Sequence, residues 1–89
     1  MPYQSGVVPV GTTAALICTV GSAPENDGVL INNGGSVTVY LGGSGVTAST
    51  GFPVAAASTV TVPTTGAEGL ALYGITSSST SDISFLFPG

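Results

Sequence analysis

The sequence predicts an all-β fold: a small antiparallel β-sandwich or jelly-roll-like domain with an extended N-terminal arm and essentially no helix. Short valine-rich segments recur along the chain, bounded by clusters of Gly, Pro, Asn or Ser, as is typical of strands joined by turns. None of the longer segments of the chain spaces its apolar residues with the period of an α-helix. Although the 89 residues include 14 glycines and 6 prolines, a hydrophobic content of 43% favours a folded domain over a disordered chain.

Strand-like segments cover most of the chain after residue 13. We expect strands over Ala14–Val20, Val29–Asn32, Val37–Leu41, Thr59–Pro63, Leu70–Ile75 and Asp82–Phe87. Where apolar and polar residues alternate, the apolar ones should face the core of the domain, and the opposite face of the sheet should be exposed to solvent. The core positions expected on this ground are Val37, Val39, Leu41, Val60, Val62, Ile83, Phe85 and Phe87. Their hydroxyl-bearing neighbours should face solvent or a partner.

Two connections carry specific expectations. The run Asn32-Asn33-Gly34-Gly35 contains Asn-Gly, which supplies the positive φ angles of a tight turn, so we expect a hairpin that pairs residues 29–32 with 36–41. Residues 42–53 lack a strand pattern and are expected to form an ordered connection that crosses between sheets. Val46 and Phe52 would anchor it on the domain's own core, and contact with a neighbouring subunit is the alternative.

The N-terminal segment differs from the rest of the chain. Residues 1–13 contain Pro2 and Pro9 without clear periodicity, which suggests an extended arm that lies on a neighbouring molecule. A frayed terminus or an edge strand explains the same residues equally well. The expected division is therefore an arm over residues 1–13 and a β-sandwich domain over residues 14–89.

The charge inventory excludes several classes of partner. The chain has no Lys, Arg or His and four acidic residues, which gives a net charge of −4. A protein without cations cannot neutralise phosphates, so we expect no binding to nucleic acid and no attraction to anionic membranes. The sequence also shows no apolar stretch long enough to span a bilayer and no basic residues typical of a signal peptide, which favours a soluble cytoplasmic product.

A chain this short needs an additional source of stability, because a small domain buries only about 60 to 65% of the surface that its unfolded chain exposes. Cys18 is the only cysteine and there is no histidine, so neither an intrachain disulfide nor a zinc site can form. Cys18 lies in an apolar run and is expected to be a buried small hydrophobe. Association with other chains is therefore the expected source of additional stability.

The residues available for chemistry do not suggest an enzyme. Without His or Lys, the serines lack their usual activator, and the carboxylates do not form a recognisable catalytic pair. Glu25 and Asp27, with Asn26 between them, lie in a turn and offer too few ligands for a calcium loop. Gly42–Gly45 is not followed by the Lys-Ser/Thr of a phosphate loop. We expect no catalytic residues, no cofactor and no metal.

The order of the strand motifs resembles that of small virion proteins of tailed phages, of the capsid decoration or minor capsid protein type. The resemblance covers about two thirds of the chain and excludes the first 28 residues. Its pieces are a strand ending in Asn, a valine strand closing in Leu-Gly, a Val-Thr-x-x-x-Gly segment, a Thr/Val strand and a Leu-Tyr-x-Ile strand. Here they are Leu30–Asn32, Val37–Gly42, Val46–Gly51, Ser58–Val62 and Leu72–Thr76.

The resemblance implies a structural protein, made in the host cytoplasm, that binds the outer surface of a phage capsid and stabilises it. The implied partner is the major capsid protein, and a homo-oligomer such as a trimer is expected on the virion. In this interpretation the arm contacts the capsid through Tyr3, Val7, Val8 and Val10. Two alternatives remain open: a head-fibre or tail-tip module that binds a host-surface glycan, and a tail or connector subunit.

Overall fold

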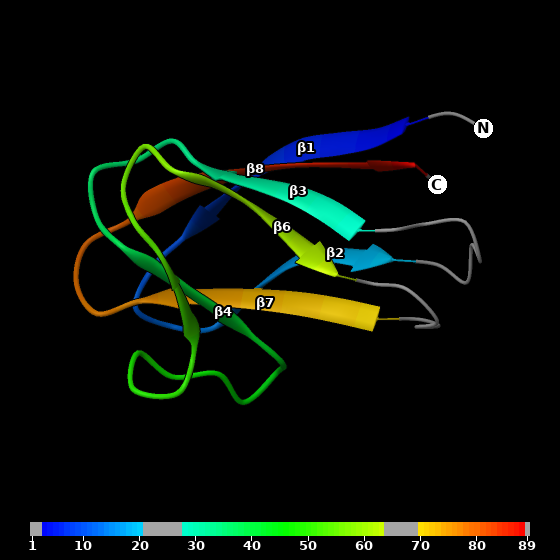
Figure 1. Cartoon of the computed structure of the whole chain (residues 1–89). Helices are drawn as coiled ribbons and strands as arrows, with labels where there is room; N and C mark the ends of the chain where they lie inside the picture. The colour runs from blue at the N-terminus through cyan, green and yellow to red at the C-terminus, as the bar shows by residue number, and fades with distance from the viewer. Residues whose placement is uncertain (1–2, 21–27, 64–69, 89) are drawn as a thin grey trace.

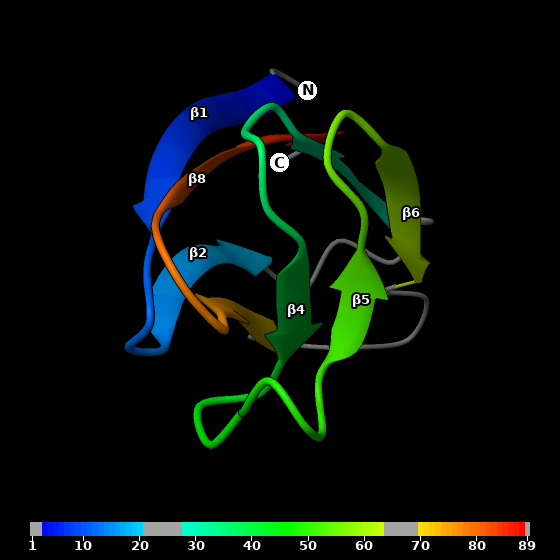
Figure 2. The same cartoon turned by 90° about the vertical axis from the view of Figure 1, so that its left-hand side faces the viewer.

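A computed structural model describes residues 3–20, 28–63 and 70–88, and this part of the chain contains two antiparallel sheets and no helix (Figures 1 and 2). No helix in these residues is long and apolar enough to cross a membrane. The predicted all-β sandwich is confirmed. Its strands are β1 (Tyr3–Val10), β2 (Ala15–Val20), β3 (Gly28–Asn33), β4 (Val39–Gly42), β5 (Phe52–Val54), β6 (Thr59–Pro63), β7 (Leu70–Thr76) and β8 (Ser81–Pro88).

The two sheets have four strands each. Sheet A has the strand order β1-β8-β3-β6, and sheet B has the order β2-β7-β4-β5. The chain changes sheet at six of its seven connections, and only β4 to β5 joins sequential strands that pair with each other. Most pairings are therefore made between segments that are distant in the sequence. Figure 2 shows the sheets as two layers, with β1 beside β8 in one layer and β4 beside β5 in the other.

The core lies between the sheets and follows the alternation of the strands. Ile31 and Ile83 from sheet A and Val39 from sheet B are fully buried. Val37, Val60, Val62 and Phe85 were expected in the core but are only partly buried, and of these Val60, Val62 and Phe85 pack against its margin. The remaining buried apolar residues of this cluster are Val10, Ile17, Cys18, Val29, Leu41, Val54, Leu72 and Phe87. A bulge between Leu16 and Cys18 turns both Ile17 and Cys18 into the core.

The expected hairpin between residues 29–32 and 36–41 is wrong. β3 pairs with β6 and β8, whereas β4 pairs with β5 and β7, so the two segments belong to different sheets. The Gly34 N–H donates to the carbonyl of Asp82, which continues the ladder between β3 and β8. The Asn-Gly turn therefore redirects the chain from sheet A to sheet B.

Asn33 explains why the chain turns in this way. Its side chain is fully buried, and Nδ2 donates to the carbonyls of Val54 and Val37 at 2.9 and 2.8 Å. Its Oδ1 accepts from Ser81 Oγ at 2.6 Å and from the Gly35 N–H at 3.1 Å. Because Val54 belongs to sheet B, the amide holds the two sheets together and fixes the turn that leaves β3. A Cβ at Gly35 would overlap Ser81, so only glycine fits there.

The connection over residues 42–53 also differs from the expectation. It joins β4 to β5, which are neighbours in sheet B, so it does not cross between sheets. It is ordered, as expected: Val46 is buried close to Gly42, and Thr47 accepts hydrogen bonds from the N–H groups of Thr50 and Gly51. Phe52, which was expected to pack onto the core, lies in β5 and is 61% exposed.

Residues 3–10 form the edge strand β1, which pairs with β8 along its whole length. Of the alternatives for this segment, the edge strand is the one present. The segment is extended, but it belongs to sheet A together with residues assigned to the sandwich domain.

Candidate interaction surface

The outer face of sheet A carries three large apolar side chains that point away from the core. Val7, Leu30 and Leu86 are 63%, 45% and 38% exposed. Leu30 lies directly opposite Leu86 across β3 and β8, and Val7 lies opposite Ser84, one diagonal step from Leu86. The three residues therefore form one cluster, which we call the sheet A patch.

Hydroxyl and amide side chains border this patch. An open depression of about 220 Å³ is lined by the apolar residues Leu30, Phe85 and Leu86 and by the polar residues Asn32, Thr59 and Ser84. Asn32 Nδ2 donates to Thr59 Oγ1 at 2.9 Å, which orients the amide along the rim. An apolar centre with a polar, uncharged rim is the composition typical of protein–protein interfaces.

Among the described residues, one charged side chain, that of Asp82, lies on this face of sheet A. Of the four acidic residues, Glu25, Asp27 and Glu68 lie outside the described residues, and Asp82 is exposed on β8 opposite Pro9. No charged side chain of the described residues lines the depression at Leu30 and Leu86, so docking there does not require the costly desolvation of any of these charges. The patch is suited to an extended, largely uncharged protein surface.

The four residues expected to contact a partner have different environments. Val7 belongs to the sheet A patch, whereas Val8 is half-buried and packs against the core. Val10 is fully buried between the sheets, so its assignment to a contact surface is corrected: it stabilises the fold. Tyr3 lies in β1 opposite Pro88, and its side chain is outside the described part of the structure.

Sequence reasoning missed Leu30 and Leu86. Each lies between two inward-facing residues of its strand, and a leucine at an outward position was the available signal. The outer face of sheet B offers fewer exposed apolar groups: Leu16 is 47% exposed opposite Tyr73, which is half-buried, as is Tyr40. Sheet A is therefore the stronger candidate for docking.

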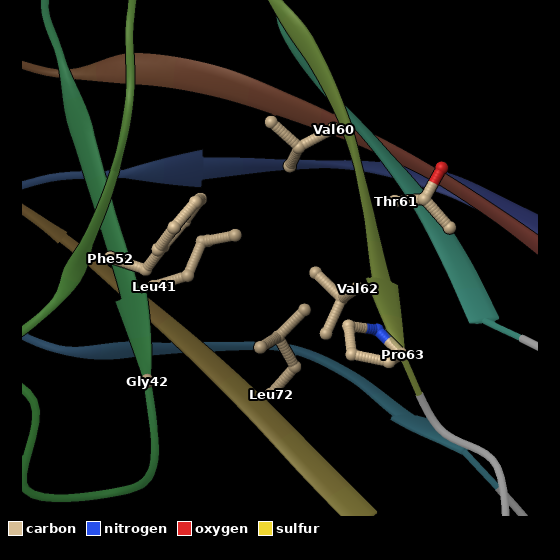
Figure 3. A pocket seen from close by; sticks show the side chains of 8 residues that line it. All are labelled: Leu41, Gly42, Phe52, Val60, Thr61, Val62, Pro63 and Leu72. Atoms are coloured by element: carbon tan, nitrogen blue, oxygen red, sulfur yellow. The ribbon is translucent and has the colours of Figure 1, made fainter.

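A second apolar feature lies at the open side of the sandwich, where β6 and β5 are the outermost strands (Figure 3). A groove of about 270 Å³ is lined by Leu41, Gly42, Phe52, Val60, Thr61, Val62, Pro63 and Leu72. In Figure 3, Val60 and Val62 from β6 point across the groove toward Leu41, Phe52 and Leu72 from sheet B. The core is thus incompletely covered along β6.

The described residues offer little for catalysis or metal binding. Burial raises the pKa of the Cys18 thiol from 9.0 to about 11, so the reactive thiolate is suppressed at neutral pH. Within residues 3–20, 28–63 and 70–88 there is no cluster of three or more metal-ligating side chains. The turn with Glu25 and Asp27 lies outside these ranges, so the structure does not address it.

No protein-family model, curated protein or solved structure matches the chain. The resemblance to phage virion proteins therefore depends on the order of the strand motifs alone.

Proposed function

We propose that the chain is a structural protein of a phage-type virion that binds the outer surface of the capsid and stabilises it. The major capsid protein is the proposed partner. The observation that carries the proposal is the sheet A patch: a small, cation-free domain presents three clustered apolar side chains on one otherwise polar sheet face. Exposed apolar clusters of this kind commonly mark docking sites.

The physical properties of the domain suit attachment to a preassembled shell. Docking on a shell stabilises a small domain by mass action, because the shell binds the folded form. The absence of Lys, Arg and His removes electrostatic attraction to the packaged nucleic acid. Both properties support a static binding role more than a catalytic one.

Binding can be tested by sedimenting the purified chain with empty heads from a phage whose structural gene cluster encodes it. The expected result is co-sedimentation that saturates at a fixed ratio to the major capsid protein. Failure to bind heads at any concentration would contradict the proposal. Binding to host envelopes or to tails instead would favour the glycan-binding or connector alternative.

Two leucines provide a matched pair of variants for the same assay. Leu30, in the sheet A patch, and Leu16, on the outer face of sheet B, are 45% and 47% exposed. Threonine keeps the strand propensity and removes most of the apolar surface. Leu30→Thr should weaken head binding by about tenfold, because a central apolar contact is worth at least 1 to 2 kcal/mol. Leu16→Thr should bind like the unmodified chain, and the opposite ranking would assign docking to sheet B.

A further inference from the structure

The four edge strands of the sandwich differ in how well they resist pairing with another chain. Sheet edges are commonly protected by proline or by bulges. β1 contains Pro9, β5 contains Pro53, and β2 carries the bulge between Leu16 and Cys18. β6 has the sequence Thr-Val-Thr-Val-Pro, and its only proline, Pro63, is the last residue. β6 is the least protected edge.

The free hydrogen-bonding groups of β6 can be identified from its pairing with β3. The Asn33 N–H donates to Ser58 O, and the Ala57 N–H donates to Asn33 O, so Asn33 occupies a hydrogen-bonded position. Bonded and non-bonded pairs alternate in an antiparallel ladder, so the next bonded partners of β3 are Val60 and Val62.

The remaining residues of β6 therefore direct their backbone groups to the open edge. Thr59 and Thr61 each present an N–H and a C=O there, and Pro63 presents a C=O. The location of Pro63 agrees with this alternation of bonded and non-bonded pairs. Pro63 lies opposite Gly28 at a non-bonded position, where β3 requires no N–H from β6.

We propose that β6 pairs antiparallel with β6 of a second copy, with the two Thr61 residues opposite each other on a two-fold axis. The Thr61 residues then exchange a pair of N–H···O bonds, and each Thr59 N–H donates to the Pro63 carbonyl of the other copy. This register overlaps the strand over its whole length. If the two-fold axis were moved by one residue toward the N-terminus, Pro63 would lie opposite Ala57 of the second copy. The regular ladder ends at Ala57.

The pairing would also cover the open side of the core. A two-fold axis perpendicular to sheet A keeps the inner faces of both copies on the same side, so Val60 lies opposite Val62 of the second copy. These valines are only half-buried in the single chain and line the groove with Phe52, which is 61% exposed. The grooves of the two copies would face each other and shield these side chains from water.

A second copy fits this edge better than a charged partner. The groove and the edge are lined by Val, Leu, Phe, Thr, Pro and Gly, without a charged side chain among the described residues around them. Neither copy would bury a charged side chain of the described residues or need a cation that the chain lacks. The inference does not rest on the proposed capsid binding, because it uses the backbone edge of β6, whereas the sheet A patch lies on the outer face of the sheet; only Thr59 borders both.

Sedimentation velocity of the purified chain tests the oligomeric state. The proposal predicts a species with twice the 8.6 kDa mass of one chain. Thr61→Pro removes the central N–H donor without removing a bond to β3, and loss of two hydrogen bonds should weaken dimerisation about 30-fold. Val7→Pro is the control. Val7 lies on β1, the opposite edge strand of sheet A, two residues before Pro9, so its backbone has the same orientation as that of a residue that is already proline. A monomer at every attainable concentration, or a trimer, would overturn the proposal.

Cysteine cross-linking tests the register and remains informative if the proline variant does not fold. Opposite residues at a bonded position have Cα atoms about 5.5 Å apart, within reach of a disulfide. Oxidised Thr61→Cys should therefore form a covalent dimer. Thr59→Cys is the control, because its copies would lie four residues apart, about 13 Å, and should not cross-link. Cross-linking of Thr59→Cys but not of Thr61→Cys would refute this pairing.

Discussion

Replacing Asn33 should be among the most destabilising single changes in the described part of the chain. Its buried amide makes hydrogen bonds to groups in both sheets, including the carbonyls of Val54 and Val37. Asn33→Ala would leave these two carbonyls without their donor. Each orphaned buried group costs about 1 to 3 kcal/mol, so the expected loss in free energy of unfolding is about 2 to 6 kcal/mol. A domain of this length has a total of only about 4 to 13 kcal/mol.

The preceding residue is a matched control. Asn32 is only half-buried, and its Nδ2 donates to Thr59 Oγ1 at an exposed site, where water can replace the bond. Asn32→Ala should therefore cost less than about 1 kcal/mol. Urea unfolding followed by far-ultraviolet circular dichroism measures both variants, and equal m-values would show that the unfolded states are comparable.

A third variant separates hydrogen bonding from volume. Asn33→Asp keeps the size of the side chain but places a carboxylate oxygen against two carbonyl oxygens. It should be at least as destabilising as Asn33→Ala at neutral pH and should recover part of its stability in acid, where the protonated carboxyl can donate one bond. If Asn33→Ala and Asn32→Ala unfolded at the same urea concentration, the inter-sheet role of Asn33 would be refuted.

Three other positions give simple stability predictions. Phe87→Ala should cost about 3 to 5 kcal/mol in thermal or urea unfolding, and Phe85→Ala should cost less because Phe85 is half-buried; the reverse order would contradict the facing of β8. Ala57 has φ of 61° at a bulge opposite Asn33, so Ala57→Gly should stabilise by up to about 1 kcal/mol, and a loss of stability would argue against this backbone conformation. The pKa of Cys18 is raised to about 11 in the folded state, so the free energy of unfolding should fall as pH rises from 9 to 11, because the unfolded thiol ionises first. Cys18→Ala should remove this dependence of stability on pH. An unchanged dependence would assign it to other groups.

The strand pattern predicted the fold class because the information needed is local. The segment Thr59–Pro63 was predicted with the bounds that β6 has, and the alternation of Ile83 and Phe87 correctly indicated buried positions. β5 was missed because it has three residues, one of them Pro53, and such a short segment carries no periodic signal.

The pairing of strands could not be predicted in the same way, because it depends on contacts between distant segments. The hairpin expectation followed the Asn-Gly turn signal, but the Asn33 side chain uses its hydrogen bonds to hold the turn toward sheet B. An arm separate from the sheet would expose Val10 together with Val7. Once β1 pairs with β8, alternation directs Val7 outward and Val10 into the core.

The central claim, that the outer face of sheet A docks on a capsid, can be measured directly by carbene footprinting of the free and head-bound chain. The label reports the solvent exposure of individual side chains. We predict that labelling of Leu30 and Leu86 falls strongly on binding, whereas labelling of Leu16 on sheet B is unchanged. Protection of Leu16 with continued labelling of Leu30 and Leu86 would contradict the claim.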